Sequence, residues 1–163
     1  MPNDQKPIER VWELMKEINI AMLITHDGHG DRLRSRPLAA RPNSEENAIY
    51  FLSDAQAAKD HEIESNPHVC VAFAETKKQK YVSVTGEAQV SNDRAKIKEL
   101  WSAADRGFWS DENDPSIRII RVTPSIAEYW ESSAGPIAAV KMAINGLTGS
   151  KADLGENKKV VLS

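Results

Sequence analysis

The alternation of apolar and polar residues divides the chain into one early helix and a series of short strands. Apolar side chains at helical spacing predict an amphipathic helix over residues 8–18. The nearly all-apolar run at 20–25 predicts a buried strand, and 27–31, rich in Gly and Asp, predicts a hairpin turn. Residues 32–41 are expected to return as the second strand and 48–53 to form the third. These three strands would make an antiparallel meander.

Proline and glycine mark where the predicted strands end or bend. Pro37 has no N–H to donate, so the second strand is expected at a sheet edge or at a bulge. Gly86 interrupts the β-rich run 81–90 and predicts the kind of bend by which sheets close into barrels. Pro124 is expected to separate two strands. The other predicted elements are strands at 68–73, 117–122 and 126–131, a helix starting at 92–94, and a last helix starting at Pro136.

The third strand leads directly into a predicted helix. Ser53, with Gln56 three residues later, matches a capping box and predicts a helix from Asp54 that ends before Pro67. The N-terminus of such a helix carries free N–H groups and partial positive charge, and therefore attracts anions. Lys59 would lie about one and a half turns into this helix, and its long side chain could reach back toward that end.

Three arginines alternate along the second strand. Arg32, Arg34 and Arg36 would point the same way, about 6.6 Å apart. Unit charges at that distance repel by roughly 2.5 kcal/mol at an effective dielectric near 20. An anion bound between the arginines would make the net electrostatic energy of the group favourable. The simpler alternative is a charged edge strand that resists aggregation. Together with the helix start on an adjacent strand, the arginines predict a site for the phosphate of a nucleotide-like cofactor.

Composition narrows the class of protein. The 163 residues fit a single domain, expected over residues 1–150, with a polar C-terminal tail at 151–163. A formal net charge of −3 speaks against nucleic-acid binding. One cysteine, Cys70, allows no disulfide within the chain, and the first residues lack the apolar core of a signal peptide, so a cytoplasmic location is expected. No apolar run of about 18 residues is present, which speaks against a membrane protein.

The sequence holds no familiar catalytic or metal-binding motif. The histidines are scattered, with no third ligand near His26 and His29, so haem binding is the weakest cofactor hypothesis and no metal site is predicted. No Gly-x-Gly-x-x-Gly, Walker or Gly-x-Ser-x-Gly motif occurs, and no side chain can be assigned as catalytic. Tyr129 and Trp130 are large neighbouring aromatics that either fill the core or form a platform for an aromatic ring system.

Taken in order, several short motifs resemble the pyridoxamine-phosphate-oxidase-like superfamily of FMN-binding split barrels, and within it the bacterial general stress proteins. Each motif is weak alone, but their order and spacing over residues 8–160 make the match specific. The motifs are Leu33–Leu38, Ile49–Ser53, Lys59–Pro67, Tyr81–Gly86, Ile97–Trp101, Ala127–Trp130 and Asp153–Val160.

The resemblance implies a mainly β fold with flanking helices, a six-stranded split β-barrel, which forms a homodimer with FMN in grooves between the subunits. It also implies that Trp101 and Trp109 cover the flavin ring. The cofactor-binding residues it implies are Arg34, Ser35, Arg36 and Pro37 for the ring and phosphate, Phe51, Leu52 and Ser53 for the ring and ribityl chain, Lys59 for the phosphate, and Trp130, often from the partner subunit.

Two departures from the family pattern bear on activity. Ala58 stands where the oxidase has an arginine before its lysine, and residues 131–136 replace its Arg- and His-containing substrate contacts. Oxidation of pyridoxamine phosphate is therefore not expected. The resemblance implies a flavin-dependent oxidoreductase of unknown substrate, with a nicotinamide or another small molecule as redox partner. The alternative is a non-catalytic stress protein that sequesters flavin or senses redox state, and a deazaflavin remains open as cofactor.

Overall fold

The computed structural model describes residues 5–28, 31–132 and 156–162. Over this part of the chain, the helices and strands follow one another in the order α1, β1–β4, α2, β5, β6, α3, η1, β7 and β8. The strands are β1 (Ile20–His26), β2 (Leu33–Ala39), β3 (Arg41–Asn43), β4 (Ala48–Asp54), β5 (His68–Glu75), β6 (Lys80–Ser91), β7 (Ile117–Glu131) and β8 (Glu156–Val161). The helices are α1 (Gln5–Ile18), α2 (Ala58–Ser65), α3 (Arg94–Leu100) and the short 3₁₀ helix η1 (Ala103–Gly107).

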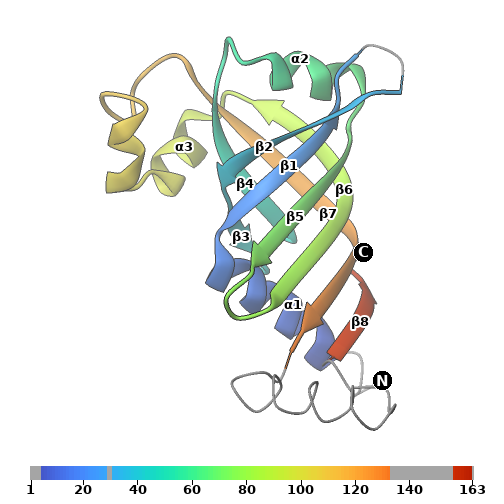
Figure 1. Ribbon diagram of the computed structural model, residues 1–163. Coiled ribbons are helices and arrows are strands. Elements are labelled where there is room, and N and C mark those ends of the chain that lie inside the picture. Colours follow the sequence, from blue (N-terminus) through green and yellow to red (C-terminus); the bar gives the residue numbers. More distant parts are fainter. Residues whose placement is uncertain (1–4, 29–30, 133–155, 163) are drawn as a thin grey trace, which may run out of the picture.

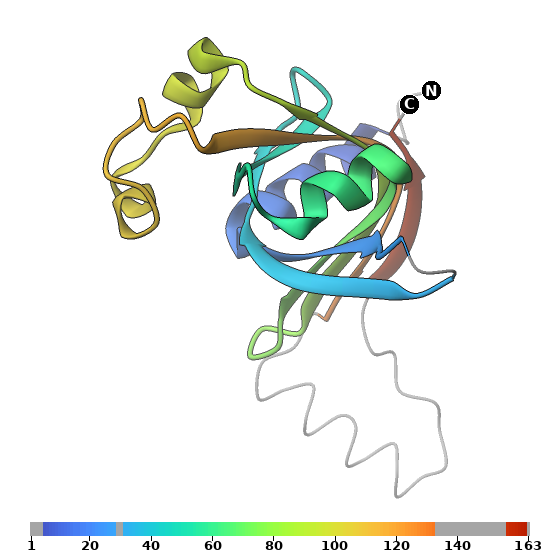
Figure 2. The same cartoon turned by 90° about the horizontal axis from the view of Figure 1, so that it is seen from above.

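The strands form one antiparallel sheet that curls into an open barrel (Figures 1 and 2). Their order is β2-β1-β5-β6-β7-β4-β3, and β8 pairs with the second half of β7. The predicted split β-barrel is confirmed, although the described sheet has 8 strands instead of six.

Two helices close the ends of the barrel. α1 packs its apolar face into the core at one end, where Trp12 is 5% exposed and so is a core residue. α2 lies across the other end (Figure 2) and contributes Ile63 to the same core. The strands supply the rest of this core, because alternate side chains of a strand point inward.

The predicted bend at Gly86 is confirmed, and it changes the interpretation of β7. The β6–β7 register shifts between Thr85 and Gly86, and a Cβ at Gly86 would collide with the carbonyl oxygen of Thr123. Pro124 pairs opposite Gly86 at this bulge, where a missing N–H is tolerated. The prediction of two strands at 117–122 and 126–131 was therefore wrong: β7 bends here and continues.

The predicted three-strand meander was also wrong. The stretch 32–41 breaks at Ala40, so that β2 pairs with β1 whereas β3 pairs with β4. β4 continues the sheet through β7, which places β2 and β4 near its opposite ends. Pro37 lies on the edge strand β2, as predicted. Curling of the sheet, and not hydrogen bonding, is what brings β2 back toward β4 (Figure 2).

A second, smaller core lies outside the barrel, between β4, β7 and α3. Asp93 caps α3 by accepting the N–H of Lys96 at 3.1 Å, and Ile97 packs onto the outer side of β4. Since β4 is covered on both sides, its residues from Ala48 to Ser53 are all buried. The segment 94–116, from α3 through η1 to the start of β7, projects beside the barrel as an arm (Figure 1).

Other sequence predictions fall partly outside the described residues. The last helix expected from Pro136 and residues 151–155 of the expected tail both lie outside them. The tail's end forms β8 on β7. In the part of the chain that is described, none of the helices combines the length and apolar character that crossing a membrane requires.

Candidate functional site

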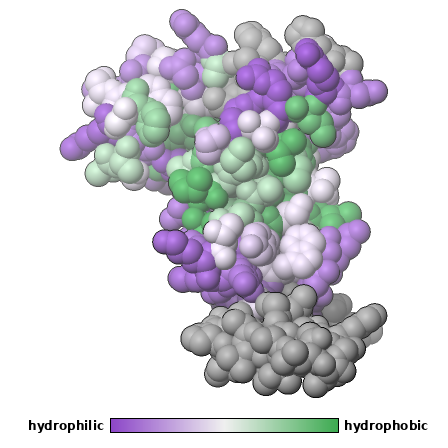
Figure 3. All heavy atoms as spheres, in the orientation of Figure 1, coloured by the Kyte–Doolittle hydropathy of each residue, from purple (hydrophilic) through white to green (hydrophobic). Residues whose placement is uncertain are grey.

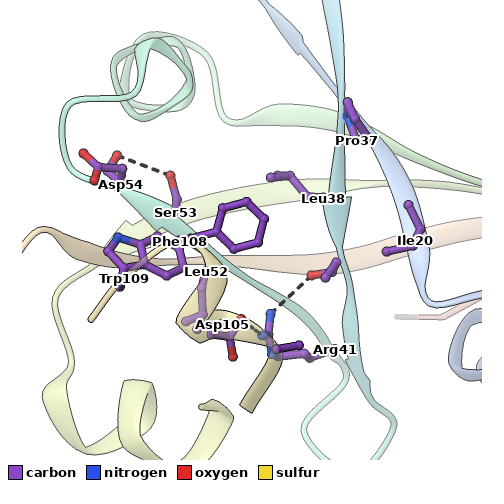
Figure 4. A pocket seen from close by; sticks show the side chains of 12 residues that line it. Ile20, Pro37, Leu38, Arg41, Leu52, Ser53, Asp54, Asp105, Phe108 and Trp109 are labelled. Atoms are coloured by element: carbon purple, nitrogen blue, oxygen red, sulfur yellow. Dashed lines mark hydrogen bonds and ion pairs between the residues drawn. The ribbon is translucent and has the colours of Figure 1, made fainter. Parts of the chain in front are cut away.

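A pocket of about 490 Å³ opens where the split in the barrel brings β2 toward β4 (Figure 4). The arm forms its third side. This volume lies within the range of sites for small molecules and cofactors, which is about 300–1,000 Å³. The lining residues are Ile20, Pro37, Leu38, Ala39, Arg41, Leu52, Ser53, Asp54, Ala104, Asp105, Phe108 and Trp109.

An ion pair fastens the arm to the barrel. Arg41, just after β2, donates to a carboxylate oxygen of Asp105 in η1 at 2.6 Å and to the carbonyl oxygen of Leu100 at 3.1 Å. The other carboxylate oxygen of Asp105 accepts the N–H and hydroxyl of Ser102, which caps η1. Burial would raise the pKa of Asp105, but Arg41 and Ser102 outweigh burial and hold that pKa below its ordinary value.

Aromatic side chains from the arm form one wall of the pocket. Phe108 and Trp109 are tilted neighbours with ring centroids 5.8 Å apart. Trp109 also packs against the smaller core, whereas Phe108 is 81% exposed and projects between β4 and β2 (Figure 4). A large apolar ring left this exposed is a surface that a planar ligand can cover.

Two of the three alternating arginines form ion pairs within the protein, with Glu62. Arg34 and Arg36 bind the two carboxylate oxygens of Glu62 from α2, at 3.0 and 2.6 Å. The buried Thr25 hydroxyl donates to Glu62 at 2.6 Å and accepts from Arg36 at 2.9 Å. The third arginine, Arg32, pairs with Asp27 at 3.2 Å. The repulsion expected between the arginines is therefore relieved within the protein, and neither Arg34 nor Arg36 lines the pocket.

The predicted helix cap is not formed. α2 begins at Ala58, after Ala57, which makes no side-chain cap. Asp54 instead closes a turn, in which its carboxylate accepts the N–H of Gln56 at 2.9 Å. The prediction of a capping box at Ser53 and Gln56 was wrong, because β4 continues through Asp54. Ser53 lies 2% exposed at the end of β4 and lines the pocket.

The structure brings three of the nine predicted contact residues, Pro37, Leu52 and Ser53, to the pocket. Phe51 points the other way, into the barrel core, and is 0% exposed. Lys59 lies in the first turn of α2, not one and a half turns in, and its side chain lies outside the described part of the chain. Of the two tryptophans expected to cover a ring, Trp109 lines the pocket and Trp101 packs on the smaller core.

The outer face of the curled sheet is apolar and exposed, and it borders the pocket (Figure 3). Met22, for example, is 37% exposed and lies in register between Pro37 and Ala72. Ile20, 53% exposed, belongs both to this outer sheet face and to the pocket rim. The half-buried Cys70 lies on this face, as does the exposed Ser35. The large exposed apolar residues of the outer sheet face are Ile20, Met22, Leu33, Ile126, Trp130 and Val161.

Glu62 and Asp105, the two carboxylates that are buried within the described residues, predict a loss of stability in acid. Burial would raise the pKa of Glu62, but Thr25, Arg36 and Arg34 lower it below its ordinary value of 4.5, and the pKa of Asp105 is likewise lowered from 3.8. A depressed folded-state pKa contributes stability above the ordinary pKa, which is lost as the pH falls through the folded value. Urea unfolding should therefore show a constant midpoint from pH 7 to about 5 and a falling one below about 4. An unchanged midpoint at pH 3 would contradict this prediction.

Several residues of the site were missed from the sequence. Arg41 pairs with Asp105, 64 residues away, and Glu62 pairs with residues that are 26 to 37 positions away. No local spacing in the sequence indicates such pairs. Phe108 carries a weak signal, since two adjacent aromatics in a polar stretch exceed the needs of a surface loop. Within the described residues, no three His, Cys, Asp or Glu side chains gather in a way that could hold a metal ion.

A curled antiparallel sheet with an apolar pocket at its split defines the class of split β-barrel proteins, and comparison with known proteins identifies the family. The model of the family described as "Pyridoxamine 5'-phosphate oxidase like" matches residues 6–153. The chain therefore belongs to the pyridoxamine 5'-phosphate oxidase like family, as its motifs predicted.

Individual relatives are distant in sequence. Protein bli-3 of Neurospora crassa is 23% identical, over 98% of this chain and 81% of that protein. A putative general stress protein 26 from Jannaschia sp. CCS1 has a TM-score of 0.76 at 22% identity, covering 96% of this chain and 99% of its own. The general stress FMN/FAD binding protein from Xanthomonas citri has a TM-score of 0.69 at 21% identity, covering 80% and 92%. These structural similarities show a shared fold.

Proposed function

We propose that the pocket between β2, β4 and the arm binds a flavin mononucleotide, FMN. The observation that carries this proposal is the lining of the pocket: apolar and aromatic walls that end at a polar corner formed by Ser53 and Asp54, just before α2. Membership of the family and the likeness to a structure named as an FMN/FAD binding protein support it.

The residues present fit such a group. Leu38 and Leu52 offer two apolar sides, and Phe108 offers an exposed ring for stacking. Ser53 and the first turn of α2 lie at the other end, where a phosphate would meet helix N–H groups and the positive end of the helix. The flavin would supply electron or hydride transfer, and these side chains would orient it and exclude water.

The protein is further proposed to act as a homodimer through the outer sheet face. Exposed apolar patches of this kind mark interaction sites. Because Ile20 and Pro37 border both this face and the pocket, a second copy seated on the face would cover the open side of the pocket. Trp130, 38% exposed on the outer sheet face, is the aromatic side chain that the partner would contribute.

The open aromatic wall of the pocket favours an oxidoreductase over a non-catalytic protein that sequesters flavin. Trp109 lines the pocket but Trp101 packs on the smaller core, so one of the expected aromatic covers is absent and a small redox partner can approach a bound ring from the side of the arm. A storage protein would instead bury the ring completely. Substrate and electron donor are best sought among nicotinamides and small planar acceptors, and pyridoxamine phosphate oxidation is not part of the proposal.

The test is a visible absorption spectrum of the purified protein, followed by rapid mixing of the flavin-loaded protein with NADH and NADPH. The expected result is a bound flavin spectrum and bleaching by one of the two donors. A colourless protein that does not quench the fluorescence of added FMN would end the flavin proposal. A flavin spectrum without reduction by any small donor would favour the non-catalytic alternative, and a bound deazaflavin would be recognised by its own spectrum.

Replacing Lys59 with alanine is expected to weaken FMN binding by about 1–3 kcal/mol, the range for hydrogen bonds to charged groups. Lys59 lies in the first turn of α2, at the proposed phosphate end of the site. Riboflavin has no phosphate, so the variant and the wild type should bind riboflavin equally, as measured by quenching of flavin fluorescence. Lys98→Ala, which removes a lysine that is 71% exposed on α3, is the matched control. An equal loss for both flavins would contradict the assignment.

A further inference from the structure

A buried carboxylate joins three elements at the end of the barrel where α2 lies. Glu62 is 6% exposed, and the described partners of its carboxylate come from β1 and β2: Thr25, Arg34 and Arg36. Two guanidinium groups and one carboxylate leave one positive charge on this cluster, and Arg34, 53% exposed, is its solvent side. We call these four residues the Glu62 cluster.

The Glu62 cluster holds α2 on one side, and the end of β4 holds it on the other. Ala57, directly before α2, donates its N–H to the carbonyl oxygen of Asp54 at 2.9 Å, and Ala55 donates to that of Ser116 at 2.7 Å. The connection from the pocket-lining residue Asp54 to α2 is therefore short and fastened. Any shift of α2 against β2 would be transmitted over three residues to the polar corner of the pocket.

The hydrophobic contribution of α2 is small. Within its described side chains, Ile63 is the buried apolar residue that joins the core, and the helix has only 8 residues. A helix this short is marginal without tertiary contacts. The hydrogen bonds and ion pairs of Glu62 are thus a large share of what fixes its position.

We infer that Glu62 is a positioning residue, which with Arg34 and Arg36 locks α2 across the end of the barrel and so holds the phosphate end of the site in place. This inference rests on the flavin site proposed above. It assigns the arginines of β2 an indirect role: they bind the helix that would meet the phosphate, and the carboxylate of Glu62 occupies the place where an external anion would otherwise sit. The lowered pKa of Glu62 agrees with a carboxylate that is charged at neutral pH.

Glu62→Gln separates this role from direct phosphate binding by the sign of its effect. If Arg34 and Arg36 bound the phosphate themselves, removal of the competing carboxylate would free them and tighten FMN binding. If Glu62 positions α2, the same change should weaken FMN binding about tenfold, which corresponds to the loss of one charged hydrogen bond. Riboflavin binding should change less than twofold, because the ring side of the pocket is built from β2, β4 and the arm.

Hydrogen exchange gives a readout that does not depend on flavin. In apo Glu62→Gln, the amides of α2 should exchange about tenfold faster than in the wild type, while those of β5 and β6 keep their protection. Glu9→Gln, which neutralises an exposed carboxylate on α1, is the control and should change neither quantity. If Glu62→Gln does not fold, Arg34→Met removes the half-exposed partner and should shift both quantities the same way, by about threefold.

Each outcome of these experiments either supports or overturns the positioning role of Glu62. Weaker FMN binding with unchanged riboflavin binding and faster exchange in α2 supports the inference. Tighter or unchanged FMN binding, an equal loss for riboflavin, or unchanged exchange in α2 would overturn it. If the wild type binds neither flavin, the proposed function fails, and the exchange of α2 in the variant still shows whether Glu62 locks the helix.

Discussion

Replacing Phe51 with alanine is expected to lower the free energy of unfolding by about 3–5 kcal/mol, the range for large-to-small changes of an aromatic core residue. Phe51 is 0% exposed and packs in the main core of the barrel. The loss has two parts, the transfer free energy of the ring and the cavity that it leaves in the main core. Urea unfolding of the apo protein measures it directly.

Two further variants test whether Phe51 acts as a core residue or as a flavin contact. Phe51→Leu keeps most of the volume and should cost less than half as much. Leu52→Ala, one residue along the strand, removes a side chain that both lines the pocket and packs in the smaller core, so it should lower flavin affinity as well as stability. An apo Phe51→Ala protein of wild-type stability that has lost flavin binding would show that the ring belongs to the cofactor site after all.

Replacing Met22 with arginine is expected to convert the proposed dimer into a monomer. Met22 is 37% exposed and lies in register between Pro37 and Ala72 on the outer sheet face. An arginine there would leave a charge without a partner in the middle of an apolar interface, at a cost of about 2 kcal/mol or more for each copy. Sedimentation should show half the mass, and flavin affinity should fall at least tenfold because the partner no longer covers the pocket.

The matched control for Met22→Arg places a charge on another exposed site. Ala95 is exposed on α3, away from the outer sheet face, so Ala95→Lys should leave both mass and flavin affinity unchanged. Wild-type protein that sediments as a monomer with flavin bound would contradict the interfacial site. A Met22→Arg dimer would move the interface to another surface, and the exposed Phe108 on the arm would be the next to test.

The family and most of the elements were predictable because they depend on short-range patterns. The helix at 8–18, the strand at 20–25 and the bend at Gly86 all follow from periodicity or from one special residue, and all are present. The split barrel followed from motif order along the chain. The capping box failed because its pattern, Ser53 with Gln56, also fits the end of a strand followed by a turn.

Contacts between distant residues explain what the sequence could not predict. The alternation predicted three arginines on one face of the second strand, and two of them, Arg34 and Arg36, do share a face of β2, whereas Arg32 precedes the strand and pairs with Asp27. What neutralises the charge on β2 is decided by α2, which folds Glu62 back onto β2 from 26 residues away. The same holds for Arg41 and Asp105, 64 residues apart, which fix the aromatic wall of the pocket.

The residue pattern alone determined most of the strands, the edge position of Pro37, the bend at Gly86 and the family. Only the tertiary structure decided that β2 meets β4 across the split and not as neighbours in a meander, and that Phe51 faces the core while Leu52 and Ser53 face the pocket. The physical reason is that periodicity reports which side of a strand is buried, whereas curling of the whole sheet decides what each side meets. On β4 both sides are buried, by the barrel core and by the arm, so the pattern carried no sign of which one faced the site.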